Sequence, residues 1–367
     1  MKKITPYTYI AALAALLCTA CSKSDGEGPD PLPDTPEETQ VIGFGASASD
    51  AQSAERAASF SASSPAMRTA SRAATKFIND EAFKQDGKFY VYSNYDYSKV
   101  DGKYTKTVPE FQKQLVTYDA VTDPQKPKWT YTPKKYWSAS GAYHFIGCYP
   151  TQADIVSSST GKNLVVNYSI HADNYDLMVA YHHRDMETET GNRTRPVELL
   201  FNHALSAIRL KMKSKQGKVY TLKNVHFRNL YTVGVLVYNE LNISNCWKQV
   251  YKHTSSEIYN YDGIATDLIT EDTPEKPTFK SDFLLAIPQT VNPDPPVDDK
   301  PKAELRFTIE VAGQQVTTIK TLPTLQWEAG KMYTYVVNVQ PGAQTTIEVE
   351  TTQWDPIDAT SEDIIIE

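Results

Sequence analysis

The chain has 367 residues and a formal net charge of −7, and its 23 tyrosines stand beside frequent threonine and valine. This length predicts about two domains with room for a sizeable core, and the residue types favour strands over helices. The acidic balance argues against a nucleic-acid partner, because phosphate binding needs a basic face.

The N-terminus carries an export signal. Two lysines precede a short apolar run, Ile10 to Leu17, which is too short to cross the core of a bilayer. Small residues then precede Cys21, as in a bacterial lipoprotein signal. The pattern predicts a signal peptide over residues 1–20, cleavage between Ala20 and Cys21, and lipidation of the Cys21 thiol, with palmitate among the attached chains. Two acyl chains would hold the protein stably at the outer membrane. An ordinary secretory signal with an incidental cysteine is the alternative.

Three segments of different composition follow the signal. Residues 21–40 are rich in Pro, Gly, Asp and Glu, which predicts a disordered linker. A short apolar strand is expected at Val41-Ile42-Gly43-Phe44. Residues 46–74 consist mainly of small residues such as Ala and Ser and are expected to form a mobile segment.

The rest of the chain reads as short strands separated by turn residues. This spacing predicts an all-β fold of two β-sandwich domains in tandem, built mainly from antiparallel strands, over residues 41–195 and 196–367. In the second domain, the alternating stretch 208–214 predicts a half-buried strand. A Gln216-Gly217 turn is expected to fold it into a hairpin with the next strand. Further predicted elements are one continuous strand over 283–291, a hairpin at Gly313 and a final hairpin at Pro341-Gly342.

Sequence motifs give no support for catalysis or for a cofactor. The triplet His183-Arg184-Asp185 matches a kinase catalytic loop, but Thr190 stands where the metal-binding Asn is required. The histidines are not spaced as metal ligands, so neither a metal nor any other cofactor is predicted. A pair of glycosidase carboxylates is not excluded by sequence. Cys148 and Cys246 are expected to be free buried thiols, with a bridge between them as the alternative.

The five tryptophans offer a choice between sugar stacking and core packing. Each lies beside strand-like sequence, where packing in the core is the commoner fate. The core is therefore the expected place for Trp129, Trp137, Trp247, Trp327 and Trp354.

Several blocks of sequence together resemble the fimbrillin-like family of Bacteroidetes pilus subunits and fimbria-associated lipoproteins. The resemblance covers most of the chain and rests on the lipoprotein signal, the strand VIGFGAS and the step SRAATKF. It rests further on three longer blocks: WTYTPKKYWSASGAYHFIGCYP, VELLFNHALSAIRLKMK and LQWEAGKMYTYVVNV. None of these blocks is a catalytic motif.

The resemblance implies a structural and adhesive role without enzymatic activity. It implies two transthyretin-like β-sandwich domains exported as an outer-membrane lipoprotein and then carried into a surface fimbria. In polymerising members a trypsin-like protease cuts after an arginine and removes the first strand. A strand from another pilus subunit then fills the groove, since an open sheet edge offers unpaired backbone groups and apolar pockets. Host or microbial surface ligands are further implied partners.

The resemblance assigns roles to a few residues of this chain. Cys21 matches the lipidated cysteine, and Arg72 best matches the cleaved arginine, with Arg68 and Arg56 as rivals in equally open sequence. The removable strand is matched by Val41, Ile42 and Phe44. Three alternatives remain: an anchor or tip subunit of the same family, a surface lipoprotein that binds glycans, and a glycan hydrolase.

Overall fold

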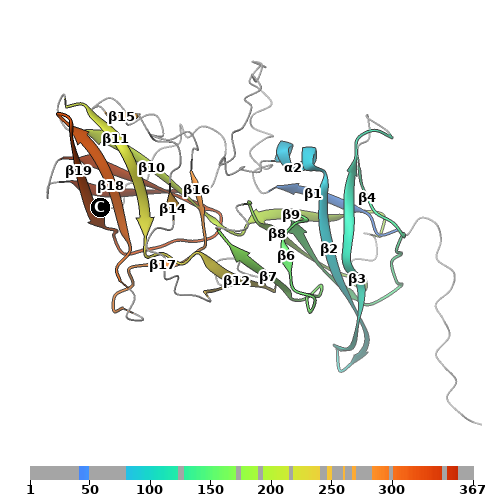
Figure 1. The fold of residues 1–367 in the computed structure, drawn as a ribbon. Coiled ribbons are helices and arrows are strands. Elements are labelled where there is room, and N and C mark those ends of the chain that lie inside the picture. Colours follow the sequence, from blue (N-terminus) through green and yellow to red (C-terminus); the bar gives the residue numbers. More distant parts are fainter. Residues whose placement is uncertain are drawn as a thin grey trace, which may run out of the picture. The chain divides into compact units, whose positions relative to one another are not determined.

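The structure, a computed structural model, describes the chain from residue 41 to residue 353 with interruptions. The described residues are 41–48, 80–122, 128–170, 175–188, 193–214, 218–239, 246–249, 259–260, 267–269, 283–296, 301–340 and 345–353. They form an all-β fold, which confirms the predicted class (Figure 1). The helix α2 (Asp80–Asp86) is short, and no helix in these ranges has the length and apolar character needed to cross a membrane.

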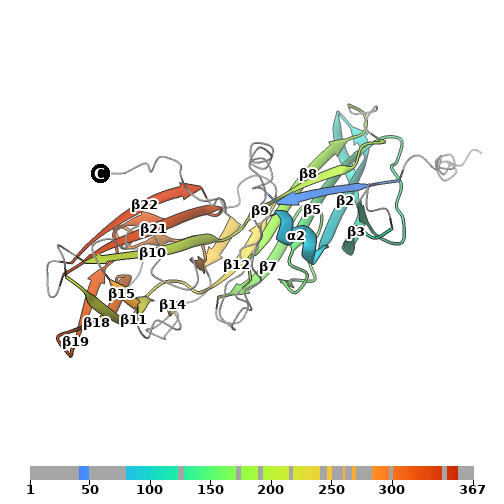
Figure 2. The same cartoon turned by 90° about the horizontal axis from the view of Figure 1, so that it is seen from above.

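The first half of the chain closes into a barrel. Its strands follow one another in the order β1 (Phe44–Ala48), β4 (Lys128–Thr130), β3 (Lys103–Asp119), β2 (Lys88–Val100), β5 (Ala142–Tyr149), β8 (Met178–Asp185) and β9 (Val197–His203). Neighbouring strands are antiparallel with one exception, the parallel pair of β1 and β9 that closes the ring. The backbones of β1, β8 and β9 lie side by side in Figure 2.

The two faces of strand β5 pack into two different clusters of buried side chains. Tyr143 and Phe145 point into the barrel, whereas Ile146 and Cys148 point outward into a second cluster of buried side chains, as the period of two in a strand requires. Gly147 faces inward at the point where the ring of Phe201 crosses. A Cβ there would lie 2.6 Å from Phe201 Cζ, so the strand needs a residue without a side chain.

The outward face of the barrel is covered by a small antiparallel sheet. Its strands are β6 (Asp154–Ile155), β7 (Leu164–Ser169), β12 (Val233–Tyr238) and β13 (Trp247–Gln249). Strand β12 pairs with β7, and β9 pairs with β8, so strands that follow residue 196 in the sequence join sheets of the first half. The domain boundary predicted after residue 195 stays a prediction.

The remaining strands build two further sheets around a shared core. One sheet has the order β16 (Leu284–Ala286), β10 (Ser206–Ser214), β21 (Lys331–Val339) and β22 (Thr346–Gln353). The other contains β14 (Tyr259–Asn260), β11 (Tyr220–Arg228), β18 (Glu304–Val311) and β19 (Gln314–Thr321), with β15 (Asp267–Ile269) also paired to β11. A two-stranded sheet joins β17 (Thr290–Val291) to β20 (Leu325–Gln326). Trp327, with no exposed surface, lies in this core beside Tyr335.

Two predicted elements of the second half are wrong in detail. The hairpin expected at Gln216-Gly217 does not form, because β10 pairs with β16 and β21 while β11 pairs with β14, β15 and β18. The stretch 283–291 is not one strand, since β16 and β17 on either side of Pro288 join different sheets. Strand β16 instead joins the sheet of β10, and β17 pairs with β20.

The two other hairpins are present. Strands β18 and β19 pair from Glu304↔Thr321 to Val311↔Gln314, and both loop residues, Ala312 and Gly313, have positive φ, which suits a tight two-residue turn. Strands β21 and β22 pair from Lys331↔Gln353 to Asn338↔Thr346, as expected from the Pro341-Gly342 turn.

Candidate functional site

The strand β1 and the groove that holds it form the candidate site, called here the β1 site. On one side β1 runs parallel to β9, from the pair Phe44↔Val197 to the pair Ala48↔Phe201. On the other side it pairs with β4 at a single position, Phe44↔Trp129. This strand therefore closes the barrel, but only one of its two edges is fully paired.

The inward side chains of residues 42–48 are apolar, and they become smaller towards the C-terminal end of β1. Ile42 and Ala48 have no exposed surface, and Phe44 and Ala46 are nearly as deeply buried. The ring of Phe44 meets three others edge-on, with centroid distances of 5.6 Å to Phe111, 5.4 Å to Tyr131 and 6.0 Å to Phe145. Edge-to-face packing of this kind adds to the free energy of burial. The groove thus accepts large side chains at positions 42 and 44, followed by two small ones.

The outward face of β1 lies under a carboxylate. Gly45 pairs with Glu198 of β9, and a Cβ at position 45 would collide with the carboxylate oxygens of Glu198 in their present position. Since that side chain is long and exposed, it can swing away to admit a small residue. This face therefore favours Gly and tolerates other small residues.

Two buried aromatic side chains fasten the backbone of β1 and of the residues just before it. The indole Nε1 of Trp129 donates a hydrogen bond to the carbonyl of Ala46 at 3.1 Å, and the hydroxyl of Tyr131 donates to the carbonyl of Ile42 at 2.7 Å. Burial raises the pKa of Tyr131 to about 12, so its hydroxyl stays protonated and able to donate. Both contacts go to backbone atoms and therefore do not depend on the side chains of β1.

Helix α2 closes the C-terminal end of the site. The backbone N–H of Ala48 donates to the Asp80 carboxylate at 3.1 Å. Phe83 of the same helix is fully buried and packs against Trp129 and Phe201. The end of β1 therefore lies beside the first residue of α2, although residues 49–79 separate them in the sequence.

Arg184, from the triplet that resembles a kinase loop, supports the start of β9. Its guanidinium donates to the carbonyls of Arg195 at 3.0 Å and Pro196 at 2.9 Å and lies 4.9 Å from the centroid of the Trp137 ring. The next residue, Val197, donates its N–H to the carbonyl of Gly43 at 2.8 Å. Arg184 thus holds the backbone against which β1 docks.

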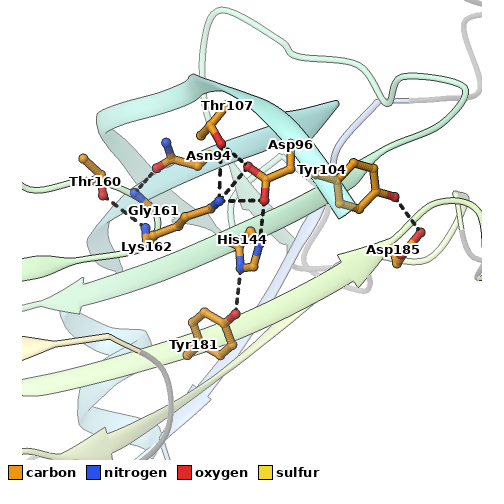
Figure 3. Close-up of polar contacts among 10 residues, drawn as sticks. All are labelled: Asn94, Asp96, Tyr104, Thr107, His144, Thr160, Gly161, Lys162, Tyr181 and Asp185. Atoms are coloured by element: carbon orange, nitrogen blue, oxygen red, sulfur yellow. Dashed lines mark hydrogen bonds and ion pairs between the residues drawn. The ribbon is translucent and has the colours of Figure 1, made fainter. Parts of the chain in front are cut away.

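A polar network lies on the outside of the barrel, away from the β1 core (Figure 3). The Asp96 carboxylate contacts Lys162 Nζ at 2.6 Å, Thr107 Oγ1 at 2.6 Å and His144 Nε2 at 3.1 Å. His144 Nδ1 lies 2.8 Å from the Tyr181 hydroxyl. A neutral imidazole protonated at Nε2 satisfies both contacts of this histidine.

The protonation of this network follows from its surroundings. Burial alone would raise the pKa of Asp96, but hydrogen bonds from Lys162 and Thr107 outweigh it and lower the pKa below its usual value. Burial, with the neighbouring His183 and Lys162, lowers the pKa of His144. A charged Asp96 and a neutral His144 are therefore favoured. The network ties the Lys162 loop to strand β2.

The backbone strengthens the same connection. Gly161 donates its N–H to the Asn94 side chain at 2.6 Å, and a Cβ at Gly161 would collide with the backbone of β2. These contacts hold the loop around Lys162 in place. No group of three or more His, Cys, Asp or Glu side chains suited to a metal ion occurs within the described ranges.

The predicted site residues divide into two groups. Val41 forms an isolated bridge to Tyr136, and Ile42 and Phe44 are core residues of the β1 site. The strand itself lies at Phe44–Ala48, a few residues later than expected. Ala20, Cys21, Arg56, Arg68 and Arg72 lie outside the described residues.

The fates of the tryptophans and the free cysteines agree with their predictions where the structure describes them. Trp129, Trp137, Trp247 and Trp327 are buried, and Trp354 lies outside the described residues. Cys148 and Cys246 are buried, and no disulfide joins them. Burial raises the pKa of the Cys148 thiol to about 12.

Sequence reasoning missed the residues that fasten β1. The sequence alone places Trp129 in the core and assigns no role to Tyr131 or Glu198. The signal that could have found Tyr131 is its place two residues after Trp129, which puts both on the same face of an extended segment. No local signal links Glu198 to Gly45, because their contact depends on a parallel pairing distant in sequence.

Comparison with known proteins places the chain in a family. The model of the fimbrillin-like family matches residues 71–354. The chain therefore belongs to the fimbrillin-like family. This membership supports a pilus-type adhesive subunit that acts with other pilus components at the cell surface.

Solved structures of low sequence identity are also similar to parts of the fold. A candidate cell adhesion protein from Bacteroides uniformis aligns with a TM-score of 0.41 and 14% identity, over 73% of this chain and 91% of that one. The tip fimbrial protein Mfa3 from Porphyromonas gingivalis aligns with a TM-score of 0.33 and 9% identity, over 72% and 94%. A fimbrial assembly protein from Parabacteroides distasonis aligns with a TM-score of 0.33 and 9% identity, over 73% and 88%. No curated protein matches the chain in sequence.

Proposed function

We propose that this chain is a non-enzymatic pilus subunit whose β1 site exchanges its own strand for one from another subunit. The chain is exported with residues 1–20 as its signal peptide and is held at the outer membrane by lipid on Cys21. A trypsin-like protease then cuts after Arg72, with Arg68 and Arg56 as alternative sites. The cut frees β1 from the body of the protein and so prepares the subunit for a surface fimbria, where it meets host or microbial ligands.

The observation that carries this proposal is the way β1 is attached. It lies between the anchor region and the arginines, and residues 49–79 are its covalent link to the rest of the barrel. One edge is paired with β9 and the other touches β4 at one position. A cut within 49–79 leaves β1 held by noncovalent contacts alone. The family match begins at residue 71 and leaves β1 out.

Loss of β1 would leave an open groove that favours the binding of another strand. The groove would expose the aromatic pocket around Phe44 and the unpaired edge of β9. Burial of one side chain of the size of Phe or Ile is worth about 1.5–3 kcal/mol, so an empty groove is costly. A strand from another subunit would restore both the backbone pairing and the apolar contacts.

The first experiment determines the N-terminus of the protein recovered from the cell surface by mass spectrometry. A diacylated Cys21 in the membrane fraction and an N-terminus at Ala73 in the fimbrial fraction are expected. An N-terminus at Thr69 or Ala57 would assign the cut to Arg68 or Arg56. A surface protein that keeps β1 covalently attached in assembled fimbriae would overturn the exchange.

Glycan binding is the second candidate. The observation in its favour is a stack of tyrosines that begins at the buried Tyr143, with centroids 4.7 Å apart for Tyr143 and Tyr95 and 5.6 Å apart for Tyr95 and Tyr97. Tyr95 and Tyr97 are partly exposed, whereas the four described tryptophans are buried. A glycan array tests this role. Binding that is lost in a Tyr97→Ala variant would support it, and no binding by the unaltered protein would exclude it for the glycans tested.

A further inference from the structure

The hairpin of β2 and β3 has an open sheet edge near its tip. Strand β2 pairs with β5 only as far as Asp96↔Ala142, so beyond this pair its neighbour among the described strands is β3 alone. Strand β3 in turn pairs with β4 only at residues 117–119. The stretch 103–108 of β3 therefore has β2 on one edge and no described strand on the other. Figure 1 shows the end of this hairpin extending beyond the neighbouring strands.

The hairpin tip is held in place by its own contacts. Asp101 and Gly102 both have positive φ, which suits a tight two-residue turn. The Tyr104 hydroxyl donates to the Asp185 carboxylate of β8 at 3.2 Å, and Lys99 forms an ion pair with Glu187. The open edge is therefore formed before any partner arrives, and binding does not have to order it.

The hairpin tip is basic, although the whole chain has a net charge of −7. Between residues 97 and 108 it carries Lys99, Lys103 and Lys106 against a single acid, Asp101. Lys106 is exposed, its ammonium lies 5.8 Å from the centroid of the Tyr97 ring, and it has no carboxylate partner within the described ranges. A strand with acidic side chains complements this edge in both backbone pairing and charge.

We propose that the open edge of β3 binds the edge strand β22 of a second copy of this chain. The inference goes beyond the exchange of β1, because it needs no cleavage and uses two other strands. Each copy carries both edges, so the contact can repeat from copy to copy, as heterologous contacts do in filaments.

Charge selects β22 over the other long edge strand. Among the described sheets, two strands of eight residues each end a sheet: β19 and β22. Strand β19 contains Lys320 and no acid, so it would bring a further positive charge to the lysines of the hairpin tip. Strand β22 contains Glu348 and Glu350 and no basic residue. It therefore fits the edge of β3, whereas β19 does not.

The two carboxylates of β22 are held only by contacts that another copy can replace. Glu348 is exposed, and its Oε1 accepts a hydrogen bond from Asn338 at 3.1 Å. Glu350 Oε2 lies 3.9 Å from Lys211 Nζ. Exposed ion pairs of this kind contribute little to stability. The carboxylates can therefore turn toward a neighbouring copy at small cost.

One antiparallel register brings the opposite charges together. When Glu348 lies opposite Lys106, Glu350 lies opposite Tyr104, because antiparallel pairs keep a constant sum of residue numbers. The Lys99 ammonium lies over the Tyr104 ring, 4.5 Å from its centroid, and so comes near the second carboxylate. On the other face, the β-branched residues of β22 meet the threonines of β3, a favourable kind of cross-strand pair.

The contact is small, so it should be reversible. Its core is the stretch 103–108 of one copy against β22 of the next, whereas a stable protein interface has about 20–30 residues on each side. A single contact of this size is weak, and repetition along an assembly strengthens it.

A charge-reversal experiment tests the proposal on the uncut chain. The chain from residue 21, with Cys21→Ser to keep it free of lipid, is followed by analytical ultracentrifugation at low ionic strength, where charges are least screened. Self-association is expected below about 1 mM. Lys106→Glu and Glu348→Lys should each weaken it at least about tenfold, because each places like charges opposite one another. An equimolar mixture of the two variants should restore it, since each reversed charge then meets the other.

A matched variant controls for net charge. Lys218→Glu changes the charge of the chain as much as Lys106→Glu does, at an exposed position just before β11, and should leave the association unchanged. Thermal unfolding confirms that each variant is folded, and Glu350→Lys replaces Glu348→Lys if that chain does not fold. The proposal is overturned by a chain that stays monomeric up to about 1 mM. It is also overturned by a mixture that does not restore association, or by equal losses in Lys218→Glu.

A cross-link tests the register and the choice of strand. The same register places Thr346 opposite Val108, and both residues are exposed. A copy with Val108→Cys is mixed with a copy with Thr346→Cys, and mass spectrometry measures the disulfide between copies. Thr317→Cys, at an exposed position of β19, is the matched control and should give at least about tenfold less product. Equal yields overturn the assignment to β22.

These samples also separate the edge contact from the proposed function. Residues 41–48 stay covalently attached in all of them, so cleavage and strand exchange cannot cause the association. Uptake of a peptide with the sequence VIGFGASAS by the chain cut at Arg72 tests the exchange. Uptake without association of the uncut chain overturns only the edge contact, whereas association without uptake overturns only the exchange.

Discussion

Two parallel strand pairs in the described part of the chain are built very differently. Strand β21 runs beside β10 from Ala207↔Met332 to Ser214↔Val339, and β22 pairs along its other edge. Strand β1 runs beside β9 over its five residues and meets β4 at one position. A strand bonded on both edges belongs permanently to its sheet, whereas a strand bonded along one edge can leave when its covalent link is cut. This difference in pairing is the reason for proposing β1 as the exchangeable element.

The largest expected effects compare one core residue from each pair. Tyr335 in β21 has no exposed surface, and its hydroxyl accepts a hydrogen bond from Trp327 Nε1 at 3.1 Å. Tyr335→Ala and Phe44→Ala should each lower the free energy of unfolding by about 3–5 kcal/mol in the uncut chain, because each leaves a large cavity. Urea denaturation measures both.

Cleavage should separate these two variants. After cleavage at Arg72 and the removal of β1, Phe44 is no longer part of the protein. The loss of unfolding free energy caused by Phe44→Ala should therefore vanish. Tyr335→Ala should keep its full cost, because β21 stays in place. A Phe44→Ala effect that survives the removal of β1 would show that the strand remains bound.

A smaller effect on stability is expected from a substitution of Gly147, which lies in strand β5 of the barrel. The Cβ of Gly147→Ala would lie 2.6 Å from the ring of Phe201, which pairs with Ala48 of β1. Overpacking of this kind should cost about 1–3 kcal/mol, measured by urea denaturation. Gly43→Ala is the matched control, because its new Cβ would have its nearest neighbour at 3.9 Å. Equal losses in the two variants would contradict the close packing against Phe201.

The polar network outside the barrel should make stability depend on pH. The folded-state pKa of His144 is lowered, so the unfolded chain binds the proton more tightly. Stability is therefore fully present above about pH 6.5, the ordinary histidine value, and falls as the pH drops through the lowered pKa. His144→Gln should flatten this loss in thermal unfolding between pH 7 and pH 5. An unchanged pH profile would contradict a neutral buried His144.

Asp96 should act in the same network at lower pH. Its pKa is lowered in the folded state, so its contribution is present above about pH 3.9 and is lost as the pH falls through the folded-state value. At pH 7 the variant Asp96→Asn should cost about 1–3 kcal/mol, because charged hydrogen bonds to Lys162 and Thr107 are weakened. Asp101→Asn at the exposed hairpin tip is the control and should have little effect. Equal losses would contradict the network.

Removal of β1 is expected to have no effect on the reactivity of the Cys148 thiol. Cys148 lies in the cluster between the barrel and its covering sheet, whereas β1 packs in the barrel interior. Because burial raises its pKa to about 12, the thiol should react with a thiol reagent only when the protein unfolds. Removal of β1 should leave this rate unchanged, measured by the absorbance of the released thiol product. Rapid labelling of Cys148 after removal of β1 would show that the loss of β1 also opens the cluster outside the barrel interior.

The sequence predicts the elements of this fold better than their partners. Alternation at 208–214 marks a strand, and Gly313 marks a hairpin, because both signals are local. The hairpin at Gln216-Gly217 failed because a turn signal does not tell whether the chain returns to the same sheet or passes to another. The pairing of β1 with β9 could not be predicted, since it joins segments far apart in sequence. The resemblance to a family supplied the removable strand, and the structure supplies its groove.

The most direct test of strand exchange measures the uptake of a β1 peptide. The chain is cut at Arg72, β1 is removed by dilution, and a fluorescent peptide VIGFGASAS is titrated while anisotropy is followed. Saturable binding is predicted, with a loss of at least tenfold in affinity for the peptide in which Phe44 is replaced by Ala. Equal binding of the two peptides, or binding of neither to a chain shown to be folded, would contradict the account.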